Sequence, residues 1–327
     1  MFTAKSIFVS LSFVACLQVG DAVHADDYPA RSVRMIIPFA PGGASDLVAR
    51  MISPKLIQEL GQQVVVDNRG GASGNIGVEM AARATPDGYT LLLGNIGTMA
   101  INPALYPKFP VRPVRDFIGV TQVVDVPTAL AVHPSVPVAT VKEFIDYAKA
   151  RPGKLNFGSA GAGSNGRLEM EFFMRAAGIN LVHIPYKGGA GPASAALLGG
   201  EVHAAFVTLS SFLTHARAGK VKILGVAAPR RVAAAPDTQT MAEAGFSGMT
   251  TGSWQGVYVP AGTPRAIVNQ LYAVVTRVMN DPEVMKRLND SGVEVVISKS
   301  PQDFAGFMQH QTEHWAKLVK DVGVVAE

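Results

Sequence analysis

Short apolar runs alternate with amphipathic segments along most of the chain. The runs that predict β-strands are Val33–Phe39, Val64–Val66, Thr90–Leu93, Ala129–His133, Leu155–Phe157, Leu181–Pro185, Val202–Val207, Val221–Ala227 and Gly256–Val259. Helical spacing or a helix-capping signal lies between several of these runs. Alternation of this kind is typical of α/β proteins, in which mostly parallel sheets are covered by helices.

Helices are predicted where apolar residues recur with the helical period or where a capping signal precedes a segment. The spacing is helical from about Ser45 to Leu60, and Pro54 is expected to kink or split this helix. Thr140 and Glu143 have the spacing of a capping box at the start of another helix. A Thr, Asp or Ser directly before a proline predicts three late helix starts, at Thr263, Asp281 and Ser300.

Loops of glycine and small polar residues follow several of the predicted strands and lead into helices. They are 39–46, 68–75, 94–98 and 158–165. Ligands of α/β sheets bind outside the carboxyl ends of the strands, where helix N-termini present free N–H groups and a positive dipole end. The first loop, with Ser45 or Asp46 as the expected N-cap, is therefore predicted to bind an anion.

The first 25 residues have the pattern of a secretory signal. Lys5 precedes the apolar stretch Ile7–Val19, and Val23–Ala25 fits a signal-peptidase site loosely. The apolar stretch is too short to span a bilayer. A lipoprotein with Cys16 as the modified residue is the alternative. Both interpretations predict a protein that is exported to the periplasm.

Composition narrows the chemistry of the exported chain. Cys16 is the only cysteine, so the mature chain can form no disulfide, zinc–thiolate site or cysteine nucleophile. No later stretch is apolar enough to cross a membrane, so a soluble mature protein is expected. The net charge is +4 without a basic run, so no nucleic-acid partner is expected.

Residues 161–166, Gly-Ala-Gly-Ser-Asn-Gly, match the G-x-G-x-x-G pattern of dinucleotide-binding loops. That fingerprint needs an acidic residue about 20 positions later, and none occurs between Glu171 and Glu201. Export also argues against a nucleotide. We therefore interpret this loop as a carboxylate-binding loop, with Ser159, Ser164 and backbone N–H groups as hydrogen-bond donors.

Catalytic and metal-binding patterns are weak. The chain has no G-x-S-x-G elbow and no P-loop, and no motif places a serine beside a histidine, as a hydrolase would need. His310 and His314 are four residues apart but lack an evident third ligand, so a solvated helix face is favoured over a metal site. Trp254 is interpreted as a core residue in preference to a cleft wall. No cofactor and no metal are expected.

Several short motifs occur in a characteristic order over nearly the whole mature chain. They are Tyr28-Pro29, Ile36–Asp46, Val66–Arg69, Gly70–Asn75, Pro86–Thr90, Phe157–Ser164, His183–Gly188, Pro236-Asp237, Glu243–Gly245 and Trp254–Pro264. In this respect the chain resembles the Bug family, the periplasmic solute-binding receptors of tripartite tricarboxylate transporters. The resemblance implies a two-lobed, type II-like Venus-flytrap fold, with two mostly parallel sheets joined by crossing strands. It also implies a ligand in the interlobe cleft and no catalysis.

The resemblance also implies a domain division and a set of ligand-binding residues. After a signal peptide at 1–25, residues 26–124 and 253–327 would form the first lobe and residues 125–252 the second, with a crossing near Val124–Thr128. One loop of each lobe would bind the ligand carboxylate. The implied ligand-binding residues are Phe39, Ala40, Pro41, Gly42, Gly43, Ser45, Asn95, Ser159, Ala160, Gly161, Gly163, Ser164, Asn165, Tyr186 and Thr208.

One departure from the family pattern bears on the ligand. Many relatives have a polar pair such as Asp-Asn after the phenylalanine that matches Phe206, and this chain has Val207 and Thr208 there. In amino-acid-binding relatives an acid in this region can hold the ligand's amine. The change predicts a ligand without an ammonium group, with Thr208 as a hydrogen-bond donor.

The expected function is capture of a small organic mono- or dicarboxylate, aromatic acids included, and its delivery to the permease subunits of a tripartite tricarboxylate transporter. The protein is expected to act as a monomer. Two other classes stay open at this point: a ligand sensor for a signalling partner, and an exported α/β hydrolase.

Overall fold

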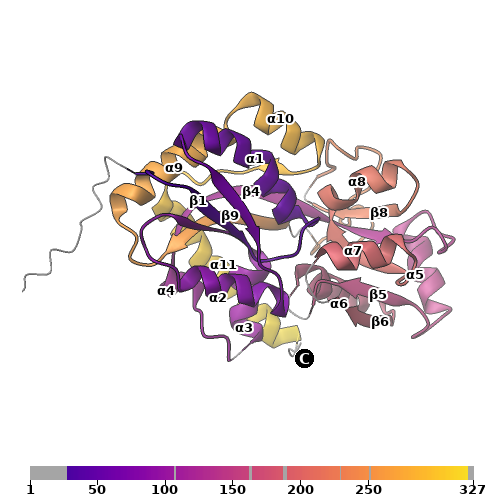
Figure 1. The fold of residues 1–327 in the computed structure, drawn as a ribbon. Coiled ribbons are helices and arrows are strands. Elements are labelled where there is room, and N and C mark those ends of the chain that lie inside the picture. Colours follow the sequence, from indigo (N-terminus) through magenta and orange to yellow (C-terminus); the bar gives the residue numbers. More distant parts are fainter. Residues whose placement is uncertain are drawn as a thin grey trace, which may run out of the picture.

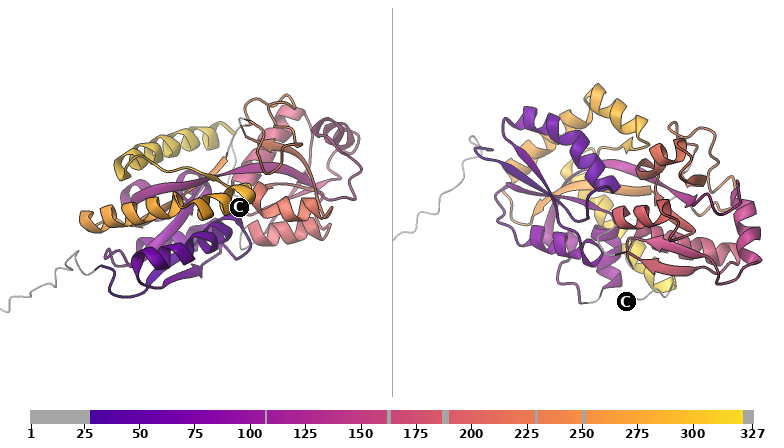
Figure 2. Two further views of the ribbon diagram at one scale, coloured as in Figure 1. Left: turned by 90° about the horizontal axis from the view of Figure 1, so that it is seen from above. Right: turned by 45° about the vertical axis from the view of Figure 1, so that its right-hand side comes forward.

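The computed structural model describes residues 28–322, except 107, 162–163, 187–189, 229 and 250–251. The predicted signal segment, Cys16 and Gly163 lie outside the described residues. The described chain forms two lobes of strands and helices side by side, with a long strand passing from one lobe to the other (Figures 1 and 2).

The first lobe is built from both ends of the described chain, and the second from its middle. The elements of the first lobe are β1 (Val33–Ile37), α1 (Ala44–Leu60), β2 (Val64–Asn68), η2 (Ala72–Gly74), α2 (Asn75–Ala82), β3 (Thr90–Asn95), η3 (Gly97–Ile101), α3 (Asn102–Leu105), α4 (Pro113–Asp116), β9 (Gly252–Pro260), α9 (Arg265–Met279), α10 (Pro282–Asp290), β10 (Glu294–Val295) and α11 (Pro301–Val322). Those of the second are α5 (Val141–Lys149), β5 (Asn156–Ser159), α6 (Asn165–Ala177), β6 (Val182–Pro185), α7 (Ala190–Leu198), β7 (Ala204–Thr208), α8 (Leu209–Arg217) and β8 (Lys222–Ala227). Strand β4 (Phe117–Val132) belongs to both.

Each lobe combines parallel strands with antiparallel crossing strands. In the first lobe β2, β1 and β3 are parallel, and β9 lies antiparallel between β3 and β4. In the second lobe β6, β5 and β7 are parallel, and β4 lies antiparallel between β7 and β8. The expected parallel pairing is thus present in both lobes, and the crossing strands make each sheet mixed.

Strand β4 is the main connection between the lobes. Its residues from Phe117 to Pro127 pair with β9, and those from Thr128 to Val132 pair with β7 and β8. The sequence predicted only the end of this strand. The 16-residue strand is buried along nearly all of its length, so the alternation of apolar and polar residues that marks a one-sided strand is absent. The predicted lobe boundaries at 124/125 and 252/253 stay a prediction.

The capping predictions were mostly confirmed. Thr140 Oγ1 accepts a hydrogen bond from the Glu143 amide at 3.1 Å, and Asp281 accepts bonds from the first turn of α10. The prediction at Thr263 was wrong. Helix α9 starts two residues later, and the Thr263 hydroxyl donates to the Pro260 carbonyl instead. Helix α1 also runs unbroken through Pro54.

Helices cover the faces of both sheets and form the core with them. In the first lobe one apolar cluster lies between the sheet and α1, α9 and α10. A second cluster, on the other face, includes Trp254, Phe304 and Trp315. Trp254 is 4% exposed and donates a hydrogen bond to Gln311, which confirms it as a core residue. Helices α7 and α8, which the sequence had not predicted, complete the second lobe.

Asp125 is an acidic group at the crossing strands. It lies on β4 opposite Trp254 of β9 and Glu294 of β10, and its Oδ1 is buried without a hydrogen-bond partner. Burial, reinforced by the nearby Glu294 carboxylate, raises the pKa of Asp125 to about 6. Between about pH 4 and pH 6 the folded state therefore binds a proton that the unfolded state has released, and stability falls as the pH rises through this window.

Replacing Asp125 with asparagine is expected to remove this pH dependence. At pH 7.5 the Asp125→Asn variant should be more stable than the wild type by about 2–3 kcal/mol, because an ionised, buried carboxylate is no longer present. At pH 4.5 the difference should shrink to under about 1 kcal/mol. Urea unfolding of both proteins at the two pH values measures it, and an equal difference at both would contradict the assignment.

Candidate functional site

A cavity of about 90 Å³ lies between the two lobes. The first lobe contributes Phe39, Gly43, Ala44, Ser45, Ser73, Asn95, Ile96 and Gly97, and the second contributes Gly158, Ser159, Ala160, Ser164, Asn165, Gly166, Ala190, Ala193, Phe206, Val207 and Thr208. Thr128, Ser253 and Gln255 of the crossing strands form its floor. No charged side chain occurs among these described lining residues.

Among the described residues, four α-helices begin at the wall of this cavity. Helices α1, α6 and α7 start at Ala44, Asn165 and Ala190, all of which line it, and α8 starts directly after the lining residue Thr208. The first turn of a helix leaves N–H groups without intrahelical partners and carries the positive end of the helix dipole. The cavity is therefore suited to an anion, although its side chains are neutral.

Hydrogen bonds to the Asp46 carboxylate hold the first-lobe loop in place. The Asp46 carboxylate accepts from the Gly42 amide at 3.1 Å and from Arg50 Nε at 2.9 Å. Burial alone would raise the pKa of Asp46, but the hydrogen bonds from Arg50 and Gly42 outweigh it and keep that pKa below its usual value. The N-cap of α1 is Gly43, so the prediction of Ser45 or Asp46 at that position was wrong.

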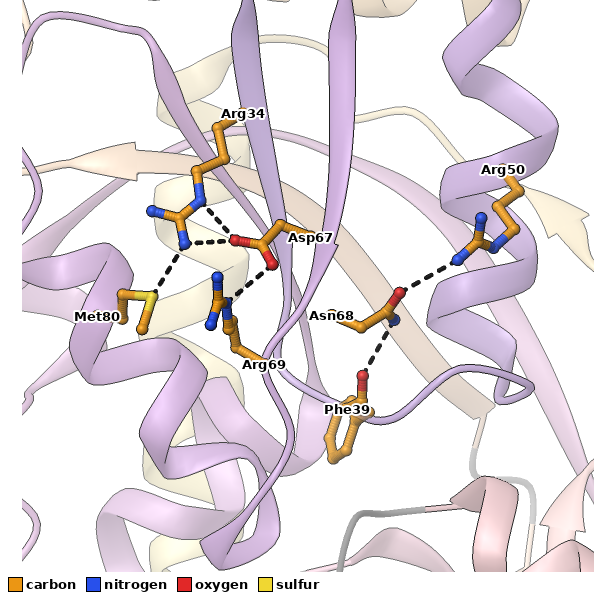
Figure 3. Close-up of polar contacts among 7 residues, drawn as sticks. All are labelled: Arg34, Phe39, Arg50, Asp67, Asn68, Arg69 and Met80. Atoms are coloured by element: carbon orange, nitrogen blue, oxygen red, sulfur yellow. Dashed lines mark hydrogen bonds and ion pairs between the residues drawn. The ribbon is translucent and has the colours of Figure 1, made fainter.

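Asn68 of β2 connects this loop to α1. Its Nδ2 donates to the Phe39 carbonyl at 3.1 Å, and its Oδ1 accepts from Arg50 Nη2 at 3.2 Å (Figure 3). The neighbouring Asp67 binds Arg34 and Arg69 in the same view. None of these cations lines the cavity, so they serve the scaffold around the loop.

The second-lobe loop has its own hydrogen-bond network around Ser159. The Ser159 Oγ lies 2.7 Å from His183 Nε2 and accepts from the Gly161 amide at 3.2 Å. Ser164 is the N-cap of α6, and its hydroxyl donates to the Gly161 carbonyl at 2.8 Å. The structure thus brings a serine beside a histidine, a pairing that no sequence motif had indicated.

The predicted site residues divide into two groups. Those that line the cavity are Phe39, Gly43, Ser45, Asn95, Ser159, Ala160, Ser164, Asn165 and Thr208. Ala40, Pro41, Gly42, Gly161 and Tyr186 are described and are not among the lining residues. The Tyr186 hydroxyl instead lies 3.3 Å from Glu201 Oε2. Whether each residue contacts a ligand stays a prediction.

The sequence missed the floor of the cavity. Thr128, Ser253 and Gln255 lie in crossing strands whose residues are mostly apolar and buried. A polar residue in such a strand was the available signal, because buried polar groups need partners. Ser73 and Ala190 were also missed, although each lies in or next to a motif that had been singled out.

The loops of the two lobes approach each other closely beside the cavity. A Cβ atom built on Gly191 of α7 would lie 2.5 Å from the Pro41 carbonyl oxygen of the first lobe. One built on Gly43 would lie 3.5 Å from Ala190 Cβ, and one on Gly161 would lie 2.6 Å from Ser73 Oγ. Glycine at 161 and 191 therefore permits this approach of the lobes.

Substitutions at Gly43 test the close approach of the two lobes from the first-lobe side. The backbone φ of Gly43 is −89°, so any residue can adopt its conformation, and an added methyl group meets Ala190 at an ordinary distance. Gly43→Ala is expected to change ligand affinity by less than about threefold, whereas the larger Gly43→Val should weaken it about tenfold by separating the lobes. Calorimetry measures both, with thermal unfolding as the control for folding. Equal affinities of the two variants would contradict this account.

Other candidate sites gain little support from the described residues. No group of three or more His, Cys, Asp or Glu side chains there is placed to hold a metal ion. His310 and His314 stack on α11 with ring centroids 6.4 Å apart. In the same part of the chain, no helix is long and apolar enough to cross a membrane.

Comparisons with known proteins point to one family. A model of the tripartite tricarboxylate transporter family receptor matches residues 48–324. Protein BugT of Bordetella pertussis is 35% identical over 312 residues, which is 95% of each chain. MatC of Rhodopseudomonas palustris, solved with bound malate, is 34% identical with a TM-score of 0.83 and covers 89% of this chain and 100% of its own. Rpa4515 of R. palustris, solved with adipate, is 34% identical with a TM-score of 0.88 and covers 91% of this chain and 99% of its own. The chain belongs to the family of tripartite tricarboxylate transporter receptors.

Proposed function

We propose that this protein captures a small organic carboxylate between its lobes and delivers it to a membrane permease. The observation that carries the proposal is the start of four α-helices at one uncharged cavity, among the described residues. The malate and adipate complexes of the two relatives are consistent with it. The family supports a tripartite transporter as the partner. Export to the periplasm with removal of residues 1–25, and action as a monomer, are further parts of the proposal.

Neutral donors can hold a carboxylate in this setting. Backbone amides of Ala44 and Ser45 and the hydroxyl of Ser45 are positioned at the cavity wall. A charge-assisted hydrogen bond is stronger than a neutral one, and exclusion of water strengthens it further. The carboxylate would therefore be bound without a counter-ion from the protein.

Closure of the lobes would couple binding to transport. Both lobes supply loops to the cavity, so a ligand can contact both lobes only when they are together. The ligand favours the closed form by its difference in affinity for the closed and open forms. A permease that recognises the closed form would then select the loaded receptor.

The lining residues favour a ligand without an ammonium group. Val207 and Thr208 stand where an acid would be needed to neutralise an amine, and none of the described lining residues is acidic. The Thr208 hydroxyl lies 2.9 Å from the Ser211 hydroxyl, and it remains at the cavity wall as a potential donor.

Calorimetry with a panel of ligands tests the proposed function. The panel contains citrate, malate, succinate, adipate, benzoate and amino acids such as aspartate and glutamate. We expect at least one carboxylate without an amine to bind, with a Kd of about 10 μM or below, or about −7 kcal/mol. Binding of amino acids alone would contradict the exclusion of an ammonium group. Binding of none would contradict the receptor function.

The serine–histidine contact makes hydrolysis the competing activity to exclude. Ser159 is 3% exposed and its hydroxyl also contacts the backbone of Gly161, so its role is to hold the loop. We propose that the protein is not an enzyme. No hydrolysis of p-nitrophenyl esters above the level of the Ser159→Ala variant is expected, and turnover that disappears in that variant would contradict this.

A further inference from the structure

The floor of the cavity is polar on one face of the crossing strands. Ser253 and Gln255 are two residues apart on β9, so their side chains lie on the same face of the sheet. They pair with Val126 and Val124 of β4, and Thr128 follows Val126 on that face. Ser253, Gln255 and Thr128 all line the cavity. The floor therefore presents a row of polar side chains at the crossing strands.

Helix α6 lies over this floor. Asn165 and Glu169 are four residues apart, so they share one face of the helix. The Thr128 hydroxyl donates to Glu169 Oε1 at 2.6 Å, which fixes that face of α6 against the floor. Asn165, one turn earlier, lines the cavity and is 8% exposed. The side chain of Asn165 is thus placed next to the polar floor.

Two of these buried side chains have polar atoms without a partner. Neither Oδ1 nor Nδ2 of Asn165 has a hydrogen bond, and Gln255 Oε1 lacks one although Gln255 is only 1% exposed. Buried polar atoms in proteins are nearly always paired. Because both residues line the cavity, a bound ligand is the partner that could satisfy these atoms.

We propose that Asn165 and Gln255 form a second subsite, which binds a hydroxyl or carboxamide at the far end of the ligand. The inference rests on the proposed function, which places the ligand's carboxylate at the helix N-termini. Asn165 offers one donor and one acceptor, and Gln255 Oε1 adds an acceptor. A hydroxyl or carboxamide both donates and accepts, so it satisfies atoms of both kinds.

Charged groups at the far end match the subsite less well. A second carboxylate only accepts hydrogen bonds, and it would face the two amide oxygens without a cation among the described lining residues. An ammonium group only donates, so Asn165 Nδ2 would stay unpaired, and no lining acid would neutralise the charge. This chain is therefore expected to prefer a ligand with a single carboxylate and a neutral polar end.

Two series of matched ligands test the subsite by calorimetry on the purified receptor. The four-carbon series is butanoate, succinate, 4-hydroxybutanoate and succinamate, and the six-carbon series is hexanoate, adipate, 6-hydroxyhexanoate and adipamate. At one of these lengths, the hydroxyl or carboxamide ligand should bind at least about tenfold tighter than both the unsubstituted acid and the dicarboxylate. Equal binding of all members at both lengths would overturn the proposal.

Variants with apolar side chains of similar shape test whether Asn165 and Gln255 cause this preference. Asn165→Leu and Gln255→Met should each reduce the preference over the unsubstituted acid to below about threefold, measured as the ratio of the two affinities within each variant. Thr276→Val is the matched control, because the Thr276 hydroxyl on α9 is also buried and unpaired but does not line the cavity. It should keep the wild-type preference.

The outcomes separate the two claims. Carboxylate binding with an unchanged preference in Asn165→Leu and Gln255→Met would overturn the subsite and leave the receptor function standing. If no carboxylate of either series or of the earlier panel binds, the proposed function fails, and the subsite fails with it. Circular dichroism of each variant confirms folding before ligands are added.

Discussion

Replacing Gly191 with alanine is expected to weaken ligand binding about a hundredfold, because the closed form would fall to roughly 1% of its wild-type population. The added Cβ would lie 2.5 Å from the Pro41 carbonyl oxygen, which belongs to the other lobe. The Pro41 carbonyl oxygen belongs to the backbone of a hydrogen-bonded loop, so it cannot move aside as a flexible side chain can. The lobes must therefore separate, and the ligand loses its contacts with one of the two lobes.

The variant should fold normally. Gly191 lies in the first turn of α7, where alanine is a better helix former than glycine by about 1 kcal/mol. Gly306→Ala is the matched control, since a Cβ atom there meets nothing within 4 Å and the residue lies in α11. Calorimetry measures the affinities, and small-angle scattering with and without ligand reports closure. Wild-type affinity in Gly191→Ala would refute the role of closure.

The largest expected effect on stability comes from Phe304. This fully buried ring of α11 covers two glycines of the crossing strands. Cβ atoms built on Gly119 and Gly256 would lie 2.6 and 2.3 Å from ring atoms of Phe304. Phe304→Ala should lower the free energy of unfolding by about 3–5 kcal/mol, because it leaves a cavity between the helix and the strands that support the floor of the site.

A double-mutant cycle tests whether ring and glycine fit each other. Gly256→Ala alone should cost about 1–3 kcal/mol, since the methyl group overlaps the ring. In the Phe304→Leu background the same change should cost at least about 1 kcal/mol less, because the shorter side chain leaves room. Urea denaturation gives the four free energies. Additive costs, or a loss below about 1 kcal/mol for Phe304→Ala, would contradict this packing.

The two loops that were expected to bind the ligand, and that contribute lining residues to the cavity, could be located because their signals are local. Glycines and small polar residues between a strand and a helix mark the edge of an α/β sheet at which ligands bind. This pattern can be recognised without knowing which strands pair with each other. Asp281 and Thr140 were predictable as caps for the same reason. Thr263 shows the limit, because its hydroxyl is directed to the Pro260 carbonyl of the preceding turn, an orientation that sequence spacing does not reveal.

The floor of the site depends on contacts between distant segments. Gln255 and Ser253 stand opposite Val124 and Val126 only through the register of two strands about 130 residues apart in sequence. The same holds for Ser159 and His183, which meet because β5 and β6 lie side by side. Long buried strands such as β4 also lack the alternating pattern that would have marked them.

A crystal structure of the protein with the tightest-binding carboxylate of the panel would show whether both lobes hold the ligand. One carboxylate is expected in the interlobe cavity, within about 3.2 Å of donors at Ala44 or Ser45 in the first lobe and of donors at Ser159 or Ala160, or of backbone amides at the start of α6, in the second. A carboxylate bound to one lobe alone, or held by a charged side chain outside this cavity, would contradict this expectation.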